Sequence, residues 1–127
     1  MTVLDASALI AWLRGEPGAA QVERALDSGA SISAVNLAEV LSKVAERGGD
    51  PQAVARDLAI EGLQVEPYGP DDAVRTALLR PLTRAHGLSL GDRACLTLGQ
   101  RSSAAVLTAD AAWSGLPDLG VTIQLIR

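Results

Sequence analysis

The chain has 127 residues, of which 48% are hydrophobic and only 2% aromatic, so it predicts a single domain with an aliphatic core. Its formal net charge of −4 excludes a general nucleic-acid-binding protein with an extensive basic face, and any contact with nucleic acid must be local. The single cysteine, Cys95, excludes an internal disulfide.

No secretion signal or membrane span is expected. The opening MTVLDASALIAWLRG has no basic leader, Asp5 interrupts its apolar residues, and no apolar run approaches the roughly 20 residues that a spanning helix needs. We therefore expect one cytoplasmic domain covering residues 1–127.

The N-terminal half is predicted to alternate short strands with helices. The stripe Leu37, Val40, Leu41 and Val44 is typical of an amphipathic helix, and Pro17 fits the first turn of a helix. The predicted elements are a strand over 2–5, a helix over 6–14, a helix over 17–27, a strand over 31–34, a helix over 36–47 and a helix over 51–61.

The C-terminal half continues the alternation, with a strand over 63–66, a helix from 71 towards 85, a helix over 89–101, and strands over 104–108 and 122–126. Pro81 is expected to kink or divide its helix. The helix over 89–101 is apolar nearly all round, which predicts a central position. Strands that alternate with helices predict an α/β fold, a three-layer α/β/α sandwich around a short, mainly parallel central sheet.

Four acidic residues from separate elements are candidates for one site, although each also has a structural explanation. Asp5 and Asp110 lie at or just beyond the carboxyl ends of strands, where sites form in such sheets. Asp5 is also placed to cap the next helix, and Asp110 could begin a turn or a short helix. Glu39 could simply form a solvated ion pair with Lys43, four residues later.

The fourth acidic residue, Asp92, follows Ser89 by three positions, which is the spacing of a helix capping box. Capping and metal binding are compatible, because a helix N-terminus favours a carboxylate and can still leave one of its oxygens outward. Mg²⁺ and Mn²⁺ prefer such hard oxygen ligands. Spacing alone does not show that the four acids converge.

Four stretches, in order and spread over the whole chain, resemble the motifs of PIN-domain ribonucleases: TVLDASALIAWL, AVNLAEVL, GLSLGDRACLTLG and VLTADAAW. The third is the most specific. The small size and the wording SLGDRACL and TADAAW are similar to the VapC toxins of type II toxin–antitoxin pairs. Some relatives carry a further acid three or four residues after the one that matches Asp110, but Trp113 and Ser114 occupy those places here, and Asp118 lies in a predicted turn.

The resemblance implies a Mg²⁺- or Mn²⁺-dependent endoribonuclease that leaves 5′-phosphate and 3′-hydroxyl ends. It implies that Asp5, Asp92 and Asp110 bind the metal and that Glu39 completes the catalytic set, as a ligand or by positioning the attacking water. It also implies an RNA substrate, a cognate antitoxin as partner and a homodimer.

Supporting roles are open for several neighbours. The hydroxyls of Ser7 and Thr108 could orient a carboxylate or a water, or serve only in capping and strand packing. Asn36 fits a helix cap better than a substrate contact. Arg93 could contact phosphate or lie on the surface.

Two alternatives keep the same fold: a non-catalytic PIN-like binding module, and a PIN nuclease in RNA processing without a toxin role. A receiver-like phospho-acceptor domain is disfavoured because Asp5 has no adjacent acid and Lys43, the one lysine, lies elsewhere in the sequence. His86 is the only histidine and lies near a helix end, so neither a Ser-His-Asp triad nor a zinc cluster is expected.

Overall fold

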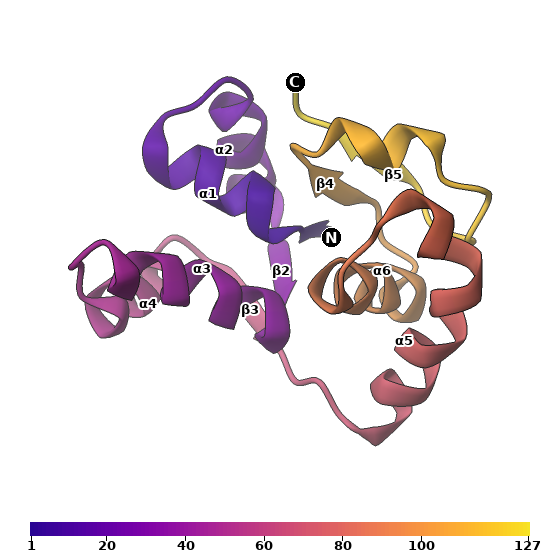
Figure 1. Ribbon diagram of the computed structural model, residues 1–127. Coiled ribbons are helices and arrows are strands. Elements are labelled where there is room, and N and C mark those ends of the chain that lie inside the picture. Colours follow the sequence, from indigo (N-terminus) through magenta and orange to yellow (C-terminus); the bar gives the residue numbers. More distant parts are fainter.

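A five-stranded, entirely parallel sheet forms the centre of the protein, as described by a computed structural model of residues 1–127 (Figure 1). Every neighbouring pair of strands is parallel, in the order β3-β2-β1-β4-β5. The strands are β1 (Thr2–Leu4), β2 (Ala30–Ser33), β3 (Leu63–Glu66), β4 (Val106–Thr108) and β5 (Ile123–Leu125).

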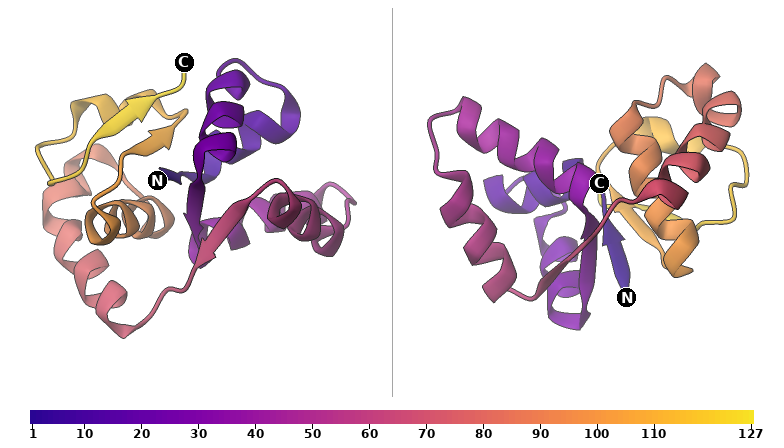
Figure 2. Two further views of the ribbon diagram at one scale, coloured as in Figure 1. Left: turned by 180° about the vertical axis from the view of Figure 1, so that it is seen from behind. Right: turned by 90° about the horizontal axis from the view of Figure 1, so that it is seen from below.

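Helices cover both faces of this sheet, which confirms the predicted three-layer sandwich. They are α1 (Ala6–Arg14), α2 (Ala19–Ser28), α3 (Ala34–Glu46), α4 (Pro51–Ile60), α5 (Pro70–Thr83) and α6 (Leu90–Ser102), with short 3-10 helices η1 (Arg84–His86) and η2 (Ala111–Gly115). Helices α1 to α4 lie on one side and α5 and α6 on the other (Figure 2). No helix combines the length and the hydropathy that a membrane-spanning segment requires.

Two separate hydrophobic cores follow from this layering. Leu4 and Ile32 face α1 to α4 in one core, whereas Val3 and Val106 pack against α5 and α6 in the other. Adjacent residues of β1 thus point to opposite faces, as the pleat of a strand requires. Cys95 is fully buried in the second core, as expected for a small apolar side chain.

The order of the strands predicts a crevice at the carboxyl ends of β1 and β4. The chain runs from β1 outward through β2 to β3, and then returns to the other side of β1 as β4. The connections on the two sides of β1 therefore diverge at the carboxyl ends of β1 and β4. A parallel sheet binds ligands at such a switch point because the loops leave room there.

Two local predictions are corrected. Helix α2 begins at Ala19 rather than at Pro17, because Gly18 takes a left-handed backbone conformation (φ 96°) and Ile126 packs directly against it. Pro81 does not divide helix α5, which continues to Thr83. Since Pro81 lies within the last turn of the helix, few backbone hydrogen bonds remain for it to interrupt.

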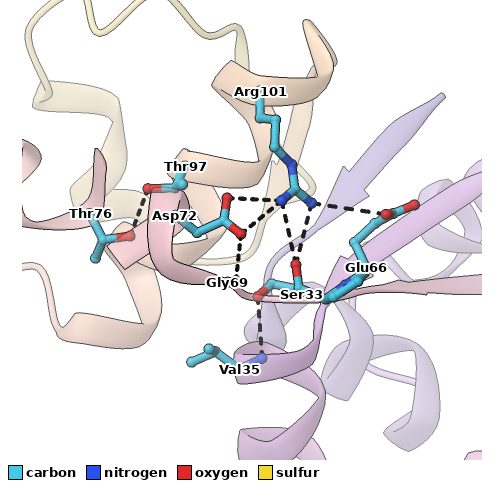
Figure 3. Close-up of polar contacts among 9 residues, drawn as sticks. Ser33, Val35, Glu66, Gly69, Asp72, Thr76, Thr97 and Arg101 are labelled. Atoms are coloured by element: carbon cyan, nitrogen blue, oxygen red, sulfur yellow. Dashed lines mark hydrogen bonds and ion pairs between the residues drawn. The ribbon is translucent and has the colours of Figure 1, made fainter. Parts of the chain in front are cut away.

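An ion pair joins helices α5 and α6 within one helical layer (Figure 3). Asp72 in the first turn of α5 is buried, and Nη1 of Arg101 donates to both of its carboxylate oxygens at 2.9 and 2.8 Å. The Gly69 amide donates to the same carboxylate at 2.8 Å. The buried charge of Asp72 is thus neutralised within the protein.

Candidate functional site

A small cleft lies at the carboxyl ends of β1 and β4, where the strand order predicts one. It has a volume of about 170 Å³, and all four predicted acidic residues line it. The complete lining is Asp5, Ala6, Ser7, Ile10, Glu39, Lys43, Asp92 and Asp110. The fold therefore brings together four carboxylates that lie up to 105 positions apart in the sequence.

Asp5 is the most buried of the four, with 3% of its surface exposed. It has the N-cap position of α1, but its side chain makes no capping hydrogen bond. Instead, the hydroxyls of Ser7 and Thr108 donate to its Oδ2 atom at 2.6 and 2.8 Å. The Asp5 side chain therefore does not cap α1, and the structural explanation predicted for it is wrong.

The two hydroxyls also connect Asp5 to the loop after β4. Oγ of Ser7 accepts from the Ala109 amide at 3.0 Å, and Oγ1 of Thr108 accepts from the Asp110 amide at 3.1 Å. Each hydroxyl thus has an acceptor and a donor, which fixes its orientation. The network fixes the position of the Asp5 carboxylate relative to the backbone of Asp110.

The electrostatics of Asp5 differ from those of an ordinary capping residue. Burial raises the pKa of its carboxyl above the usual 3.8, and the negative charge of Asp92 raises it further. The hydrogen bonds from Ser7 and Thr108 partly offset this rise. No basic side chain lies within ion-pair distance of Asp5, so its carboxylate has no direct ionic partner.

Glu39 is held by Asn36 rather than by Lys43. Nδ2 of the fully buried Asn36 donates to Oε1 of Glu39 at 2.8 Å, and also to the Gly91 carbonyl at 2.8 Å. No ion pair joins Glu39 and Lys43. The expectation that Asn36 caps its helix is wrong, because α3 starts at Ala34 with the Ser33 hydroxyl as its cap.

Gly91, which the sequence-based analysis did not single out, makes room for Glu39. A Cβ atom at Gly91 would lie 2.6 Å from Cδ of Glu39, closer than such atoms approach. The carboxylate of Glu39 therefore packs directly on the first turn of α6. Glycine destabilises a helix relative to alanine. A glycine within a helix is therefore a signal of a close approach of this kind.

Asp92 and Asp110 both have the capping roles predicted for them. Oδ2 of Asp92 accepts from the Ser89 amide at 2.9 Å, and the Ser89 hydroxyl accepts from the Asp92 amide at 3.1 Å. Oδ1 of Asp110 accepts from the Ala112 amide at 3.0 Å and begins η2. In each side chain one oxygen is used in capping, and both residues still line the cleft.

The pKa of the buried Cys95 thiol is affected by three of these acids. Burial raises the pKa of its thiol well above 9.0, and the charges of Asp5, Asp92 and Glu39 raise it further. The charges of three of the four acids thus affect the same buried thiol.

The donor set suits a hard divalent cation. Asp5 is a buried carboxylate with only neutral hydrogen-bond partners, and the surrounding groups supply oxygen atoms. The structure has no group of three or more acidic, histidine or cysteine side chains arranged closely enough to hold a metal ion. Mg²⁺ commonly takes only one or two carboxylates and keeps several waters.

Other candidates lie away from the cleft. Nη1 of Arg93 donates to the Thr76 carbonyl at 2.9 Å, which fastens α6 to α5. Asp118 accepts from the Gly120 amide at 2.9 Å in the predicted turn. Trp113 is buried in the second core, and His86 is exposed at the end of η1. Arg93, Asp118 and His86 therefore contribute nothing to the lining of the cleft.

The family model of the PIN domain matches residues 2–119 of the chain. Comparison with curated protein sequences gives no match.

Several solved structures share the fold. A toxin–antitoxin complex from Klebsiella pneumoniae aligns with a TM-score of 0.75 at 21% identity, over 100% of this chain and 98% of the other. VapBC2 from Rickettsia felis, bound to a DNA fragment from its promoter, aligns with a TM-score of 0.73 at 15% identity, over 98% and 97%. VapC20 from Mycobacterium tuberculosis, described as a toxin that cleaves the sarcin-ricin loop, aligns with a TM-score of 0.69 at 16% identity, over 94% and 98%.

Proposed function

Because the chain belongs to the PIN-domain family, we propose that it is a Mg²⁺- or Mn²⁺-dependent endoribonuclease whose catalytic residues are Asp5, Glu39, Asp92 and Asp110. The observation that carries the proposal is the state of Asp5. A buried carboxylate beside another acid, with hydroxyls as its only side-chain partners, is costly in a protein unless a cation joins it.

Asp5, Asp92 and Asp110 are the proposed metal-binding residues, Asp5 and Asp92 as direct ligands and Asp110 directly or through a bound water. Ser7 and Thr108 both contact Oδ2 of Asp5, so its other oxygen is the one available to a cation. Asp92 and Asp110 each use one oxygen for capping and can offer the other. When bound, the metal would neutralise charge on the phosphate and lower the pKa of an attacking water.

Glu39 is proposed to position that water. Asn36 binds only one of its carboxylate oxygens, which leaves the second to accept a proton or a hydrogen bond at the cleft. The hydrogen bond from Asn36 to the Gly91 carbonyl fixes α3 against α6, so Glu39 and Asp92 keep their relative position. We propose that Asn36 orients Glu39 and that Ser7 and Thr108 orient Asp5.

The test is cleavage of single-stranded and structured RNA with Mg²⁺, with Mn²⁺ and with EDTA, followed by mapping of the product ends. We expect metal-dependent cleavage that leaves 5′-phosphate and 3′-hydroxyl ends. RNA binding without cleavage under any metal condition would instead favour a non-catalytic binding module. Cleavage that persists in EDTA would contradict a metal-dependent site.

We further propose that the protein is the toxin of a toxin–antitoxin pair. The support is the similarity of its fold to toxin–antitoxin complexes together with the four-acid cleft, which favours an arginine or lysine from an inhibitor. The expected partner is an antitoxin whose basic side chain occupies the cleft. Co-purification with the product of a neighbouring gene and a structure of the complex test this, and a complex that leaves the cleft accessible to metal would contradict direct occlusion.

A homodimer is proposed as the functional assembly, following the resemblance to VapC toxins. The exposed residues Val74, Leu78 and Leu82 form an apolar stripe along α5, which supports pairing with a second copy. Light scattering of the purified chain measures its mass in solution. A monomer at micromolar concentration would contradict the proposal.

A further inference from the structure

A second hollow lies beside the carboxylate cleft, where side chains from the C-terminal ends of α1 and α3 meet. Its volume is about 340 Å³, and its lining is Arg14, Lys43, Glu46 and Arg47. We refer to these four residues as the basic groove. Lys43 lines both the groove and the cleft, so the two hollows adjoin.

The three cations of the groove are free. Arg14, Lys43 and Arg47 are exposed, and none lies within 4.0 Å of a carboxylate oxygen or donates a side-chain hydrogen bond, whereas Arg101 and Arg127 form ion pairs. With Glu46, the formal charge of the groove is three minus one, or +2. This positive surface stands out on a chain whose net charge is −4.

From this juxtaposition we infer that the basic groove binds the phosphates of the RNA strand next to the bond that is cut in the cleft. The inference rests on the proposed function. The acidic cleft by itself repels a polyanion, and a metal there neutralises only the reacting phosphate. Arg14 and Arg47 supply the planar donors that suit phosphate, and Lys43 lies between the two sites.

The competing explanation is that these cations only stabilise helix ends. Arg14 lies in the last turn of α1, and Arg47 is the C-cap residue of α3, where positive charge is favourable. The chain offers a matched control, because Arg80 lies in the last turn of α5 and Arg84 is its C-cap residue. Both control arginines are exposed, make no ion pair and belong to the other helical layer.

The experiment compares the wild-type protein with two double variants, Arg14→Gln/Arg47→Gln and Arg80→Gln/Arg84→Gln, which carry the same change of charge. Binding of a fluorescent, mixed-sequence single-stranded RNA is measured in EDTA at several salt concentrations. Thermal melts confirm that each variant is folded. Separate cleavage assays with Mg²⁺ and Mn²⁺ test the proposed function of the wild-type protein.

We expect the groove variant to weaken RNA binding about tenfold and to reduce the slope of log Kd against log salt by about 1 to 1.5, since each phosphate contact to a single strand contributes about 0.7. The control variant should change neither quantity. An equal effect of both variants, or an unchanged salt slope in the groove variant, would overturn the inference. Tighter groove-dependent binding of a polyglutamate peptide than of RNA would also overturn it and assign the groove to an acidic protein partner.

Failure of the two proposals can be distinguished. Groove-dependent RNA binding by a wild-type protein that cleaves no RNA would reject the proposed catalysis and leave the groove as a phosphate-binding surface. RNA cleavage by a wild-type protein whose affinity does not depend on Arg14 and Arg47 would keep the catalysis and reject the groove.

Discussion

Asp5 and Asp72 are both almost inaccessible to water, with 3% and 5% of their surfaces exposed, but the protein treats their charges differently. Arg101 contacts both carboxylate oxygens of Asp72, so the charge has a partner within the chain. Asp5 has only two hydroxyl donors, a neighbouring acid and a raised pKa.

The difference separates a structural carboxylate from a candidate catalytic one. A buried ion pair satisfies its own charges and leaves nothing for a ligand. A buried carboxylate without a protein cation costs stability, and a bound metal can recover that cost. Burial alone therefore does not separate these two carboxylates, whereas the nature of the nearest donors does.

Replacing the carboxylate of Asp5 is expected to have the largest effect. Asp5→Asn keeps the size of the side chain and removes one negative charge from the cleft. RNA cleavage should fall at least about a hundredfold, since even residues that only orient metal ligands cost 10- to 100-fold. Stability in EDTA should not decrease, which thermal melts measure.

Metal should also stabilise the wild-type protein and Asp5→Asn to different extents. Mg²⁺ at a hundredfold excess over Kd should stabilise the wild-type protein by about 2.7 kcal/mol and Asp5→Asn much less. Equal stabilisation of both proteins, or unchanged cleavage by the variant, would show that Asp5 has no role in binding metal.

Removing Arg101 should leave Asp72, like Asp5, as a buried carboxylate without a basic partner. Arg101→Ala is expected to lower the free energy of unfolding by about 2–3 kcal/mol, less than the usual cost of breaking a buried pair because the Arg101 side chain is 36% exposed. Tm should fall by roughly 10 °C. Cleavage per folded molecule should stay unchanged.

A second variant isolates the charge as the cause. Asp72→Asn combined with Arg101→Ala should recover part of the lost stability, because no buried charge is left unpaired. Denaturant unfolding of the single and double variants measures the coupling. If the double variant is as unstable as the sum of the two single changes, the pairing of charges is not what Arg101 contributes.

Gly91→Ala tests whether the cleft can be disturbed without changing any carboxylate. The added methyl group would displace the Glu39 carboxylate from the first turn of α6. Cleavage should fall about 10- to 100-fold, whereas stability should change by no more than about 1 kcal/mol, because alanine favours the helix. Wild-type cleavage by the variant would contradict the position assigned to Glu39.

The smallest expected effect is a pH dependence of metal-free stability. The pKa of folded Asp5 lies above its usual 3.8, so the folded state holds this proton more strongly than the unfolded state. The stabilising contribution is complete below pH 3.8 and is lost as the pH rises through the folded pKa. In EDTA, the free energy of unfolding of the wild-type protein relative to Asp5→Asn should therefore decrease from acidic to neutral pH. A difference that rises over this range would contradict the raised pKa.

The alternation of strands and helices could be predicted from local sequence, and most of the boundaries to within one residue. The capping box of Ser89 and Asp92 and the short helix after Asp110 depend on residues a few positions apart, so they could be predicted. The start of α2 could not, because the left-handed backbone at Gly18 accompanies its contact with Ile126 at the other end of the chain.

Motif order suggested which four acids belong together, whereas the hydrogen bonds that hold each of them depend on tertiary packing. Asp5 has the sequence position of a helix cap, and its hydrogen bond from Thr108 spans 103 residues. The partners of Glu39 are likewise decided by the packing of α3 on α6, where Gly91 allows the close approach and Asn36 replaces Lys43 as the neighbour. Periodicity and capping act within one or two helical turns, whereas the desolvation and hydrogen bonding of a carboxylate depend on whichever distant segments the fold places against it.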